Sequence, residues 1–390
     1  MRVAVLGAGA MGARAARTLA GLPGVEALVV GDLDGDAAAR VAAGLLPGAT
    51  ARRIDVTDGP ALRGALAGVD TVLTTVGPFY RFGAGVLRAA IETGTDYVDI
   101  CDDWEPTLQL LELDGAARAA GVCAMVGAGA SPGLSTLLAG AAAGRLDRVR
   151  DLYTAWPVDA VGRPSSCDAP AESMAGAAGV HWMHQCSGAV AELSGGAVAR
   201  RAPLRPVALR LPGGRRGTGW TVGHPEPVTL RRTVAPSGES ACLMLLRPAT
   251  AAYLDVLRRD IDAGRLTPDD AAGMLEPPSR SRVLRSLCGA FTRPGPGDLP
   301  AFFAAADGTV AGRPVRVCAR LETDGALLHD MAAVTGVPAA LATVQLSTVR
   351  RPGVHPPDAV LDGPRLFADL AVAFPGTRVI VEEEAGWLTD

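Results

Sequence analysis

A glycine-rich segment near the N-terminus has the residue types and spacing of a dinucleotide-binding loop. Gly7, Gly9 and Gly12 form the pattern G-x-G-x-x-G, with Ala10 and Met11 before the last glycine. In such a loop the first glycine permits a tight turn, the second lets the backbone approach a pyrophosphate, and the third lets a helix pack closely against a strand. The N-terminus of that helix attracts the phosphates. We therefore predict that these five residues bind the cofactor.

A carboxylate lies at the distance expected for a ribose contact. Asp32 follows the apolar run 27–30, twenty positions after Gly12. A carboxylate in this position accepts hydrogen bonds from the adenosine ribose and repels a 2′-phosphate. Neither Leu33, which we also expect beside the cofactor, nor Asp34 carries a positive charge. The sequence therefore favours NAD over NADP.

Two further segments are expected to contact the cofactor, because ligands of open α/β sheets bind beyond the carboxyl ends of the strands. Asp55 and Val56 end the run 51–56 and would flank the adenine, although they could equally precede a helix capped by Thr57 or Asp58. The run 70–76 leads into a turn that should border the nicotinamide, and its predicted contacts are Thr75, Gly77, Pro78 and Phe79.

Four side chains are candidates for moving a proton or orienting a substrate during hydride transfer. Asp102 and Asp103 follow the run 97–100, and adjacent carboxylates raise one another's pKa; their alternative role is to cap the helix that starts near Trp104. Tyr80 lies beside the expected nicotinamide. His224 lies in the turn Gly-His-Pro-Glu-Pro, where it could face a cleft or be held by a neighbouring carboxylate.

The chain contains no lysine and no asparagine, so all 37 basic residues are arginines. This excludes a lysine Schiff base and a Walker phosphate loop. A substrate carboxylate would then be bound by arginine or by backbone N–H groups. Arg231 and Arg232 are the predicted substrate contacts, together with Tyr97 at a strand end. A second arginine group is expected on a solvated hairpin: Arg205, Arg210, Arg215 and Arg216.

The pattern of apolar runs predicts the elements that position these residues. Six strands, at 3–6, 27–30, 51–56, 70–76, 97–100 and 122–126, alternate with helical segments, including one of about 16 residues after Trp104. This alternation predicts an α/β fold with an N-terminal, doubly wound parallel sheet of the Rossmann type, ending near residue 130. The stretch 254–287 is also predicted to be helical.

Composition narrows the class of protein. A chain of 390 residues predicts two domains, and the net charge of −4 argues against a nucleic-acid partner. No apolar run is long enough for a membrane span, and Met1-Arg2-Val3 enters the first strand directly, so no signal peptide is expected. Seven scattered cysteines fit reduced thiols in the cytoplasm. No metal site is predicted, because His181, His184 and Cys186 lack a second ligand pair.

The order of the motifs resembles the saccharopine dehydrogenase (saccharopine reductase) family. The resemblance rests on the glycine loop, Gly77-Pro78-Phe79, Tyr97-Val98-Asp99 and Ala130-Ser131-Pro132-Gly133. Residues 1–34 and 116–135 are most similar to the lysine 6-dehydrogenase branch, and 336–340 and 353–358 are similar to the closing segment of the family. The middle, 150–335, departs from the better-known members.

The resemblance implies a nicotinamide-dependent oxidoreductase that acts on a carbon–nitrogen bond of an amino acid derivative, in primary or specialised metabolism. It implies a Rossmann domain at 1–130, a mixed α/β domain for substrate and dimerisation at 131–335, and a segment at 336–390 that returns to the Rossmann domain. Ser131, Pro132 and Gly133 would begin a helix facing a small-molecule substrate. A homodimer is expected by analogy.

Two other functions stay open at the level of sequence. The chain could be a trans-acting enoyl reductase with a carrier-bound or lipid-like substrate, because proteins similar to saccharopine dehydrogenase include such enzymes. It could also be a nucleotide-sensing protein that has kept the fold and lost turnover. A polar cleft with paired arginines would favour an amino acid substrate. An apolar tunnel would favour an acyl substrate. A cleft blocked by side chains next to Gly77 would favour the nucleotide sensor.

Overall fold

The chain divides into two compact units. In the computed structural model, residues 1–45, 48–158, 177–275, 277–323, 326–349 and 351–386 are described. One unit comprises 1–137 with 323–378, and the other comprises 138–322 with 379–390. The predicted C-terminal segment 336–390 thus contributes its larger part to the first unit and its last residues to the second.

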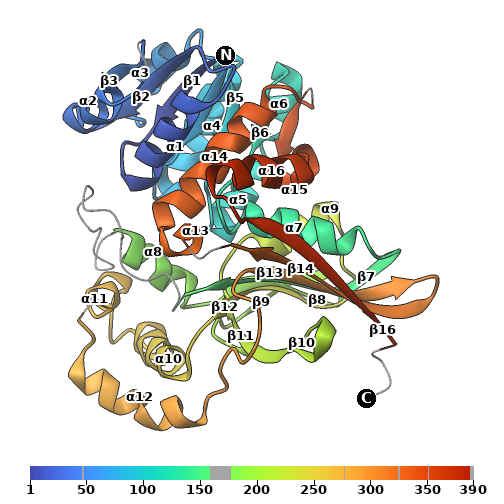
Figure 1. The fold of residues 1–390 in the computed structure, drawn as a ribbon. Helices are drawn as coiled ribbons and strands as arrows, with labels where there is room; N and C mark the ends of the chain where they lie inside the picture. Colours follow the sequence, from blue (N-terminus) through green and yellow to red (C-terminus); the bar gives the residue numbers. More distant parts are fainter. Residues whose placement is uncertain (46–47, 159–176, 276, 324–325, 350, 387–390) are drawn as a thin grey trace. The chain divides into compact units, whose positions relative to one another are not determined.

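The first unit contains a seven-stranded parallel sheet (Figure 1). Its strands are β1 (Arg2–Leu6), β2 (Ala27–Asp32), β3 (Thr50–Arg53), β4 (Thr71–Thr74), β5 (Asp96–Asp99), β6 (Cys123–Met125) and β15 (Gly353–His355). The order β3-β2-β1-β4-β5-β6 is that of a doubly wound dinucleotide-binding sheet, so the predicted Rossmann fold is confirmed. Sequence reasoning missed the seventh strand, β15, which pairs in parallel with β6.

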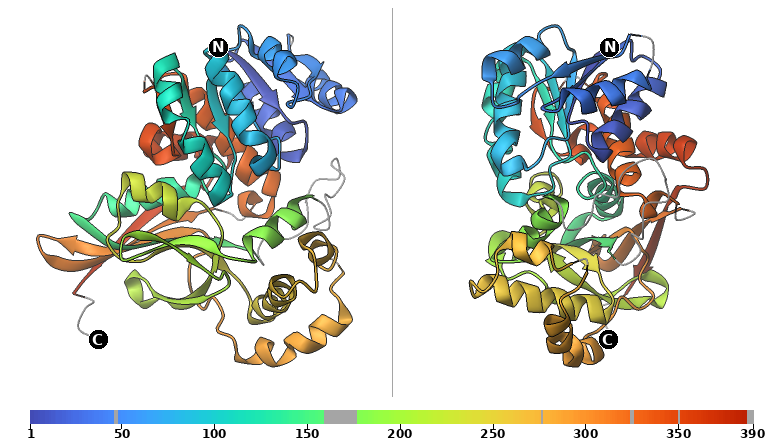
Figure 2. Two further views of the ribbon diagram at one scale, coloured as in Figure 1. Left: turned by 180° about the vertical axis from the view of Figure 1, so that it is seen from behind. Right: turned by 90° about the vertical axis from the view of Figure 1, so that its left-hand side faces the viewer.

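Helices cover both faces of this sheet, as the two views of Figure 2 show. Helices α1, α14 and α16 pack together in one layer, and α3, α4, α5 and α6 in the other. The helices of this unit are α1 (Ala10–Gly21), α2 (Gly35–Ala43), α3 (Gly59–Leu66), α4 (Phe79–Thr93), α5 (Trp104–Leu111), α6 (Asp114–Ala120), α13 (Ala326–His329), α14 (Met331–Leu346), α15 (Pro357–Val360) and α16 (Gly363–Ala373).

The long helix predicted after Trp104 is instead two helices, α5 and α6, separated at residues 112–113. Asp114, in the first turn of α6, accepts a hydrogen bond from the backbone N–H of Val354 at 2.9 Å. The new helix therefore begins where the C-terminal strand β15 docks. A contact between residues 240 positions apart leaves no local signal in the sequence.

Helix α14 lies directly against α1, which follows the glycine loop. A β-carbon at Gly336 of α14 would lie 2.6 Å from the carbonyl oxygen of Met11 and 3.1 Å from the backbone nitrogen of Ala15. Only glycine allows the two backbones to approach this closely. The C-terminal part of the chain thus supports the helix on which the predicted pyrophosphate site depends.

The second unit is built on a mixed sheet of nine strands, as predicted for a mixed α/β domain. The order is β10-β11-β12-β7-β13-β14-β16, with β8 and β9 attached through β12. Its strands are β7 (Arg148–Pro157), β8 (Val190–Ser194), β9 (Ala197–Arg201), β10 (Pro206–Arg210), β11 (Arg216–Val222), β12 (Ser240–Leu245), β13 (Phe303–Val310), β14 (Arg313–Glu322) and β16 (Arg378–Ala385).

Apolar side chains of the second unit form two buried layers, one on each face of the strands. Alternate residues of β12 contribute to different layers, with Cys242 and Met244 in one and Ala241 and Leu243 in the other, as expected for a strand buried on both faces. The helical elements here are α8 (Ala177–Gln185), η1 (Pro212–Gly214), α9 (Glu226–Thr233), α10 (Pro248–Asp262), α11 (Pro268–Ala272) and α12 (Arg280–Thr292), while α7 (Leu134–Ala143) crosses from the first unit.

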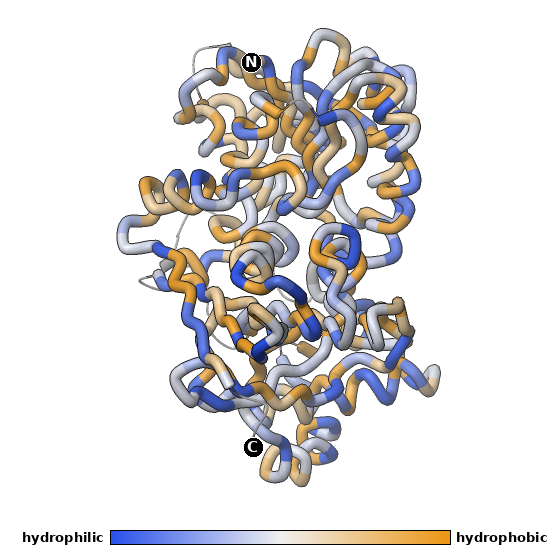
Figure 3. Tube along the Cα trace, turned by 90° about the vertical axis from the view of Figure 1, so that its right-hand side faces the viewer, coloured by the Kyte–Doolittle hydropathy of each residue, from blue (hydrophilic) through white to orange (hydrophobic). Residues whose placement is uncertain are grey.

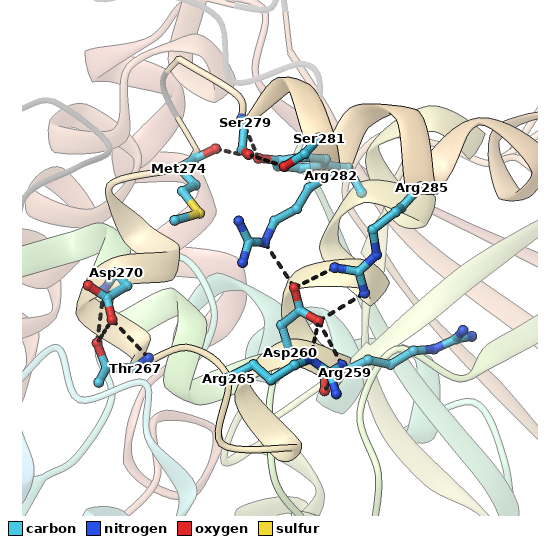
Figure 4. A network of polar contacts seen from close by, with 11 residues as sticks. Arg259, Asp260, Arg265, Thr267, Asp270, Met274, Ser279, Ser281, Arg282 and Arg285 are labelled. Atoms are coloured by element: carbon cyan, nitrogen blue, oxygen red, sulfur yellow. Dashed lines mark hydrogen bonds and ion pairs between the residues drawn. The ribbon is translucent and has the colours of Figure 1, made fainter.

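Helices α10 to α12 match the predicted helical stretch, and a buried carboxylate joins α10 to α12 (Figure 4). Asp260 of α10 is 1% exposed. It accepts hydrogen bonds from Arg282 at 2.9 Å, from Arg285 at 2.8 and 2.9 Å, and from Arg265 at 2.7 and 2.9 Å. The hydrogen bond from Arg285 has the largest effect on the pKa of Asp260, which lies well below its usual range.

Hydrophilic and hydrophobic residues are interspersed along the chain, as the colours of Figure 3 show. Within the part of the chain that the structure describes, no helix is long and apolar enough to cross a membrane. No disulfide bonds are formed by the cysteines described there, namely Cys101, Cys123, Cys186, Cys242, Cys288 and Cys318. Cys167 lies outside the described residues.

Candidate functional site

The glycine loop is a close-packed turn between β1 and α1. Gly7 has a φ of +98°, a conformation that favours glycine, and its N–H donates to the carbonyl of Gly31 at 2.8 Å. A β-carbon at Gly12 would lie 1.9 Å from the carbonyl oxygen of Gly7 and 2.7 Å from Oγ1 of Thr75. Gly7 and Gly12 are therefore required by the fold of the loop itself.

The N-terminus of α1 is suited to an anion. Gly9 occupies the N-cap position and provides no side-chain cap, so the first N–H groups of the helix point toward the loop. Ala10 and Met11 form the first turn and are half-buried. Backbone N–H groups together with the positive end of the helix dipole bind phosphate without any positively charged side chain.

Asp32 lies at the carboxyl end of β2 and holds the loop. Its Oδ2 accepts a hydrogen bond from the N–H of Ala8 at 2.6 Å, and its Oδ1 accepts one from the N–H of Asp34 at 2.8 Å. A carboxylate oxygen can accept more than one hydrogen bond, so this carboxylate can also receive ribose hydroxyls. Leu33, the next residue, is 58% exposed.

A positive charge that sequence reasoning missed lies beside Asp32. Arg53 of β3 is the register partner of Asp32, and its Nε donates to the carbonyl oxygen of Leu33 at 3.1 Å. A guanidinium beside the ribose carboxylate is the usual partner of a 2′-phosphate. The sequence did contain a sign of this charge, because Arg52 and Arg53 lie on the next predicted strand, with Arg52 twenty positions after Asp32.

The residues after β3 border a groove of about 300 Å³ between α3 and α4. Val56 lines this groove, while the exposed Asp55 accepts hydrogen bonds from the N–H and the hydroxyl of Thr57 at 2.9 and 2.6 Å. The hydroxyl of Thr57 has the largest effect in lowering the pKa of Asp55. Asp58, the residue that caps α3, accepts a hydrogen bond from Ala61 at 3.1 Å. Val56 can thus flank a base, and Asp58 takes the capping role.

The turn after β4 brings the predicted nicotinamide contacts next to the glycine loop. Thr75 donates its N–H to the carbonyl of Leu6 at 2.8 Å, and its Oγ1 lies 3.4 Å from the carbonyl oxygen of Gly7. Pro78 is the N-cap residue of α4, and Gly77 is exposed. Phe79, the first residue of α4, is buried, and its ring lies against Gly83 in the next turn of the same helix. Tyr80 is 60% exposed and remains a predicted substrate-orienting residue.

Tyr97 does not fit the predicted substrate contact. Its side chain is fully buried in β5, and its hydroxyl donates to Oδ2 of Asp99 at 2.8 Å. Asp99 also accepts the N–H groups of Cys101 and Gly127 at 3.0 and 2.7 Å. Burial raises the pKa of Asp99 to about 6, although these hydrogen bonds lower it. The motif Tyr97-Val98-Asp99 therefore fixes the ends of β5 and β6.

Asp102 and Asp103 lie at the carboxyl edge of the sheet, beside the segment that begins with Gly127. Both are half-buried, and Asp103 occupies the N-cap position of α5 without making a side-chain cap hydrogen bond. The loop 127–133 folds back at this edge, because a β-carbon at Gly127 would lie 2.4 Å from Pro132 and 3.1 Å from the carbonyl oxygen of Cys101.

The substrate candidates of this loop lie at the same edge of the sheet. Ser131 is half-buried, Pro132 is buried, and Gly133 pairs with Gly129. The structure thus gathers the predicted ends of β1, β4, β5 and β6 at one edge of the sheet. Their assignment to substrate or to proton transfer stays a prediction.

The predicted residues of the second unit occupy two different environments. His224 is 3% exposed and its ring stacks on Trp156, with ring centres 5.4 Å apart. Arg231 and Arg232 are exposed in the last turn of α9, and Arg231 donates to the carbonyl of Gly196 at 3.2 Å. The other arginine group does lie on a hairpin, because β10 and β11 pair antiparallel around residues 212–214. The predicted solvation holds only for Arg216, because Arg205, Arg210 and Arg215 are half-buried.

Residues 3–125 match the family model described as the saccharopine dehydrogenase NADP binding domain. The match includes the glycine loop and strands β1 to β6, and it ends before the loop 127–133. The N-terminal domain is thus similar to the nucleotide-binding domain of saccharopine dehydrogenases. The resemblance inferred from the motifs is thereby confirmed for this domain. The chain is an NAD(P)-dependent oxidoreductase whose nucleotide-binding domain is of the saccharopine dehydrogenase type.

Solved structures share the fold of this saccharopine dehydrogenase-type chain well beyond the matched domain. The apo, histidine-tagged saccharopine dehydrogenase (L-Glu forming) of Saccharomyces cerevisiae is 17% identical, with a TM-score of 0.62 over 98% of this chain and 100% of that chain. The homospermidine synthase of Legionella pneumophila, in complex with NAD, is 11% identical, with a TM-score of 0.56 over 99% of this chain and 91% of that chain. At these identities the likeness shows the fold.

Proposed function

We propose that the chain transfers hydride between a nicotinamide cofactor and the carbon–nitrogen bond of an amino acid derivative. The observation that supports this most is the saccharopine dehydrogenase-type loop and sheet edge of the first unit, formed by residues 3–125. Two proteins that share the fold over most of the chain are named for saccharopine and homospermidine, which both contain carbon–nitrogen bonds.

The residues of the first unit would bind and orient the cofactor. The N–H groups at the start of α1 hold the pyrophosphate, and Asp32 holds the adenosine ribose. The turn at Gly77 and Pro78 borders the reactive ring. When bound, the cofactor supplies the hydride chemistry, and the protein contributes mainly positioning.

A proton must move in the same reaction. In the reducing direction the imine carbon accepts the hydride and the nitrogen accepts a proton, and in the oxidising direction both leave the amine. Asp102, Asp103 and Tyr80 are the candidates for this proton, because all three follow strands that end at the same edge of the sheet. A group within hydrogen-bond reach of the nitrogen is required, either directly or through one water.

The proposal is tested by following NADH and NADPH absorbance with the purified chain and a panel of substrates. The panel contains three kinds of sample: amino acids together with amines, oxo acids together with ammonia or an amino acid, and enoyl thioesters. We expect turnover with an imine-forming pair. Turnover with enoyl thioesters alone would contradict the proposal in favour of an alkene reductase, and cofactor binding without any turnover would favour a nucleotide sensor.

A matched pair of glycine variants controls this assay. Gly12→Ala places a β-carbon 1.9 Å from the carbonyl oxygen of Gly7, whereas at Gly21, in the last turn of the same helix, nothing lies within 4 Å of such a carbon. We expect Gly12→Ala to lose cofactor binding and turnover. Gly21→Ala should retain both, and unchanged cofactor binding in Gly12→Ala would show that the loop is not the cofactor site.

A further inference from the structure

Three residues with side chains that ligate metals meet in the interior of the second unit. His224 follows β11, Glu226 begins α9, and Cys242 lies within β12. Their exposed fractions are 3%, 1% and 0%. A histidine, a glutamate and a cysteine therefore share one buried environment, although 18 positions separate the first from the last.

The spacing of their ligand atoms is close to that of a tetrahedral metal site. Nδ1 of His224 lies 3.7 Å from Oε2 of Glu226, and Sγ of Cys242 lies 3.7 Å from Oε1 of Glu226. One ligand atom from each residue lies within 4.8 Å of those of the other two. With Zn–S near 2.3 Å and Zn–O or Zn–N near 2.0–2.2 Å, neighbouring ligands of tetrahedral zinc are roughly 3.3–3.6 Å apart.

We propose that His224, Glu226 and Cys242 bind a divalent cation of the zinc class. Nitrogen, carboxylate oxygen and thiolate sulfur are the ligands that zinc prefers. With a neutral imidazole, the thiolate and the carboxylate balance the two positive charges, so the complex is neutral. Neutrality matters at this depth because an uncompensated charge in a protein interior is costly.

Neighbouring residues of β7 support the same site. Thr154 is the register partner of Cys242 on β7 and is 1% exposed, and its Oγ1 has no hydrogen-bond partner in the described part of the chain. Paired residues of parallel strands point to the same face of a sheet, so this hydroxyl is placed to accept a hydrogen bond from a fourth, water ligand. Trp156, two residues further on, stacks on the ring of His224 and fixes its orientation.

The site would join three elements of the second unit. Its ligands connect the end of β11, the first turn of α9 and the middle of β12. A metal at this junction fixes the Gly-His-Pro-Glu turn on the sheet independently of any chemistry in the first unit. The alternative without metal is a hydrogen-bonded cluster in which Glu226 lies between His224 and Cys242.

Metal content of the wild-type chain tests the proposal directly. The full chain is incubated with an equal amount of zinc, desalted, and measured by plasma mass spectrometry. We expect about one zinc per chain and a lower melting temperature after chelation. In parallel, cobalt substitution should produce a thiolate-to-cobalt charge-transfer band in the near ultraviolet, because a cysteine is among the ligands.

Two variants and one control locate the site. Glu226→Gln and Cys242→Ser keep the shape of the side chain and should each lower zinc retention at least tenfold, and the cobalt band should vanish in Cys242→Ser. The control is Cys186→Ser, since Cys186 is 2% exposed in the same apolar layer and burial alone raises the pKa of its thiol to well above the usual value. It should retain both signals.

Three outcomes would overturn the proposal. The first is a wild-type chain that retains only traces of zinc and shows no cobalt band, which would indicate the metal-free histidine–carboxylate pair. The second is full zinc retention in Cys242→Ser. The third is loss of zinc in Cys186→Ser with a native melting curve, which would place the metal near His181 and His184. Because the first and third outcomes are read on the wild type and the control, misfolding of the other variants cannot hide them.

Discussion

Asp32 has two roles at the scale of the single residue, because it holds the glycine loop through Ala8 and is placed to hold the ribose. Asp32→Ser shortens the side chain and removes its charge, so we expect the Kd for NAD to rise about tenfold or more, since a hydrogen bond to a charged group contributes about 1.5–3 kcal/mol. Isothermal titration calorimetry with NAD measures this change. The control is Asp36→Ser at an exposed position of α2, which should leave the Kd unchanged.

Arg53 is expected to reduce the preference for NAD over NADP. Asp32 repels a 2′-phosphate, whereas the guanidinium on the adjacent strand attracts it. We expect the wild type to bind NAD more tightly than NADP and Arg53→Ala to weaken NADP binding selectively. A wild-type preference for NADPH of more than about tenfold would contradict the ribose role of Asp32.

Asp99 should make stability depend on pH. Its pKa is about 6 in the folded protein because of burial, and about 3.9 in an unfolded chain. The folded protein therefore binds this proton more tightly, so the contribution of Asp99 is most favourable below about pH 4 and is lost as the pH rises to about 6.

The test compares the wild type with Asp99→Asn, whose amide can still accept the N–H groups of Cys101 and Gly127. Between about pH 4 and pH 7, the free energy of unfolding of the wild type should fall relative to that of the variant by about 2 kcal/mol. Urea unfolding at a series of pH values measures the difference. A difference that stays constant with pH would show that Asp99 is ionised with an ordinary pKa.

At the scale of elements, helix α12 depends on Asp260 of α10. The carboxylate accepts hydrogen bonds from Arg282 and Arg285 of α12 and from Arg265 (Figure 4). Loss of the charge weakens these charge-assisted hydrogen bonds, but Arg265 and Arg285 are about half exposed and can be solvated, so the expected cost is about 1.5–3 kcal/mol. We expect Asp260→Asn to lower the free energy of unfolding of the second unit by this amount.

Urea unfolding monitored by circular dichroism tests the role of Asp260. Asp269→Asn is the control, because Asp269 is exposed in the first turn of α11, and it should remain within about 0.5 kcal/mol of the wild type. A similarly small effect of Asp260→Asn would mean that α12 is held by its apolar contacts instead.

At the scale of the whole molecule, the first unit is assembled from two distant parts of the chain. Residues 1–137 lack β15 and α14, and α14 packs directly on α1. We expect residues 1–137 alone to show no cooperative thermal unfolding. A chain that joins 1–137 to 323–378 through a flexible linker of roughly 15 residues should unfold cooperatively and bind NADH. Cooperative unfolding of 1–137 alone would show that the C-terminal segment is dispensable.

The sequence by itself determined the nucleotide end of the protein. The glycine spacing, Asp32 and the alternation of strands and helices are local patterns, and each is set by short-range geometry: a tight turn, a helix start and a strand period of two. Asp58 as the cap of α3 and the helical stretch of the second unit have the same local origin. These features needed no knowledge of the tertiary structure.

Only the tertiary structure decided which distant residues meet. Tyr97 looked available at a strand end, yet its hydroxyl is bound to Asp99 inside the sheet. Arg53 became relevant because parallel pairing places it beside Asp32, and β15 joins the first sheet from the far end of the chain. His224, Glu226 and Cys242 form no zinc signature in the sequence, because their proximity depends on the pairing of β11 with β12. Sheet register and packing bring these residues together, and the spacing of residues within one segment predicts neither of them.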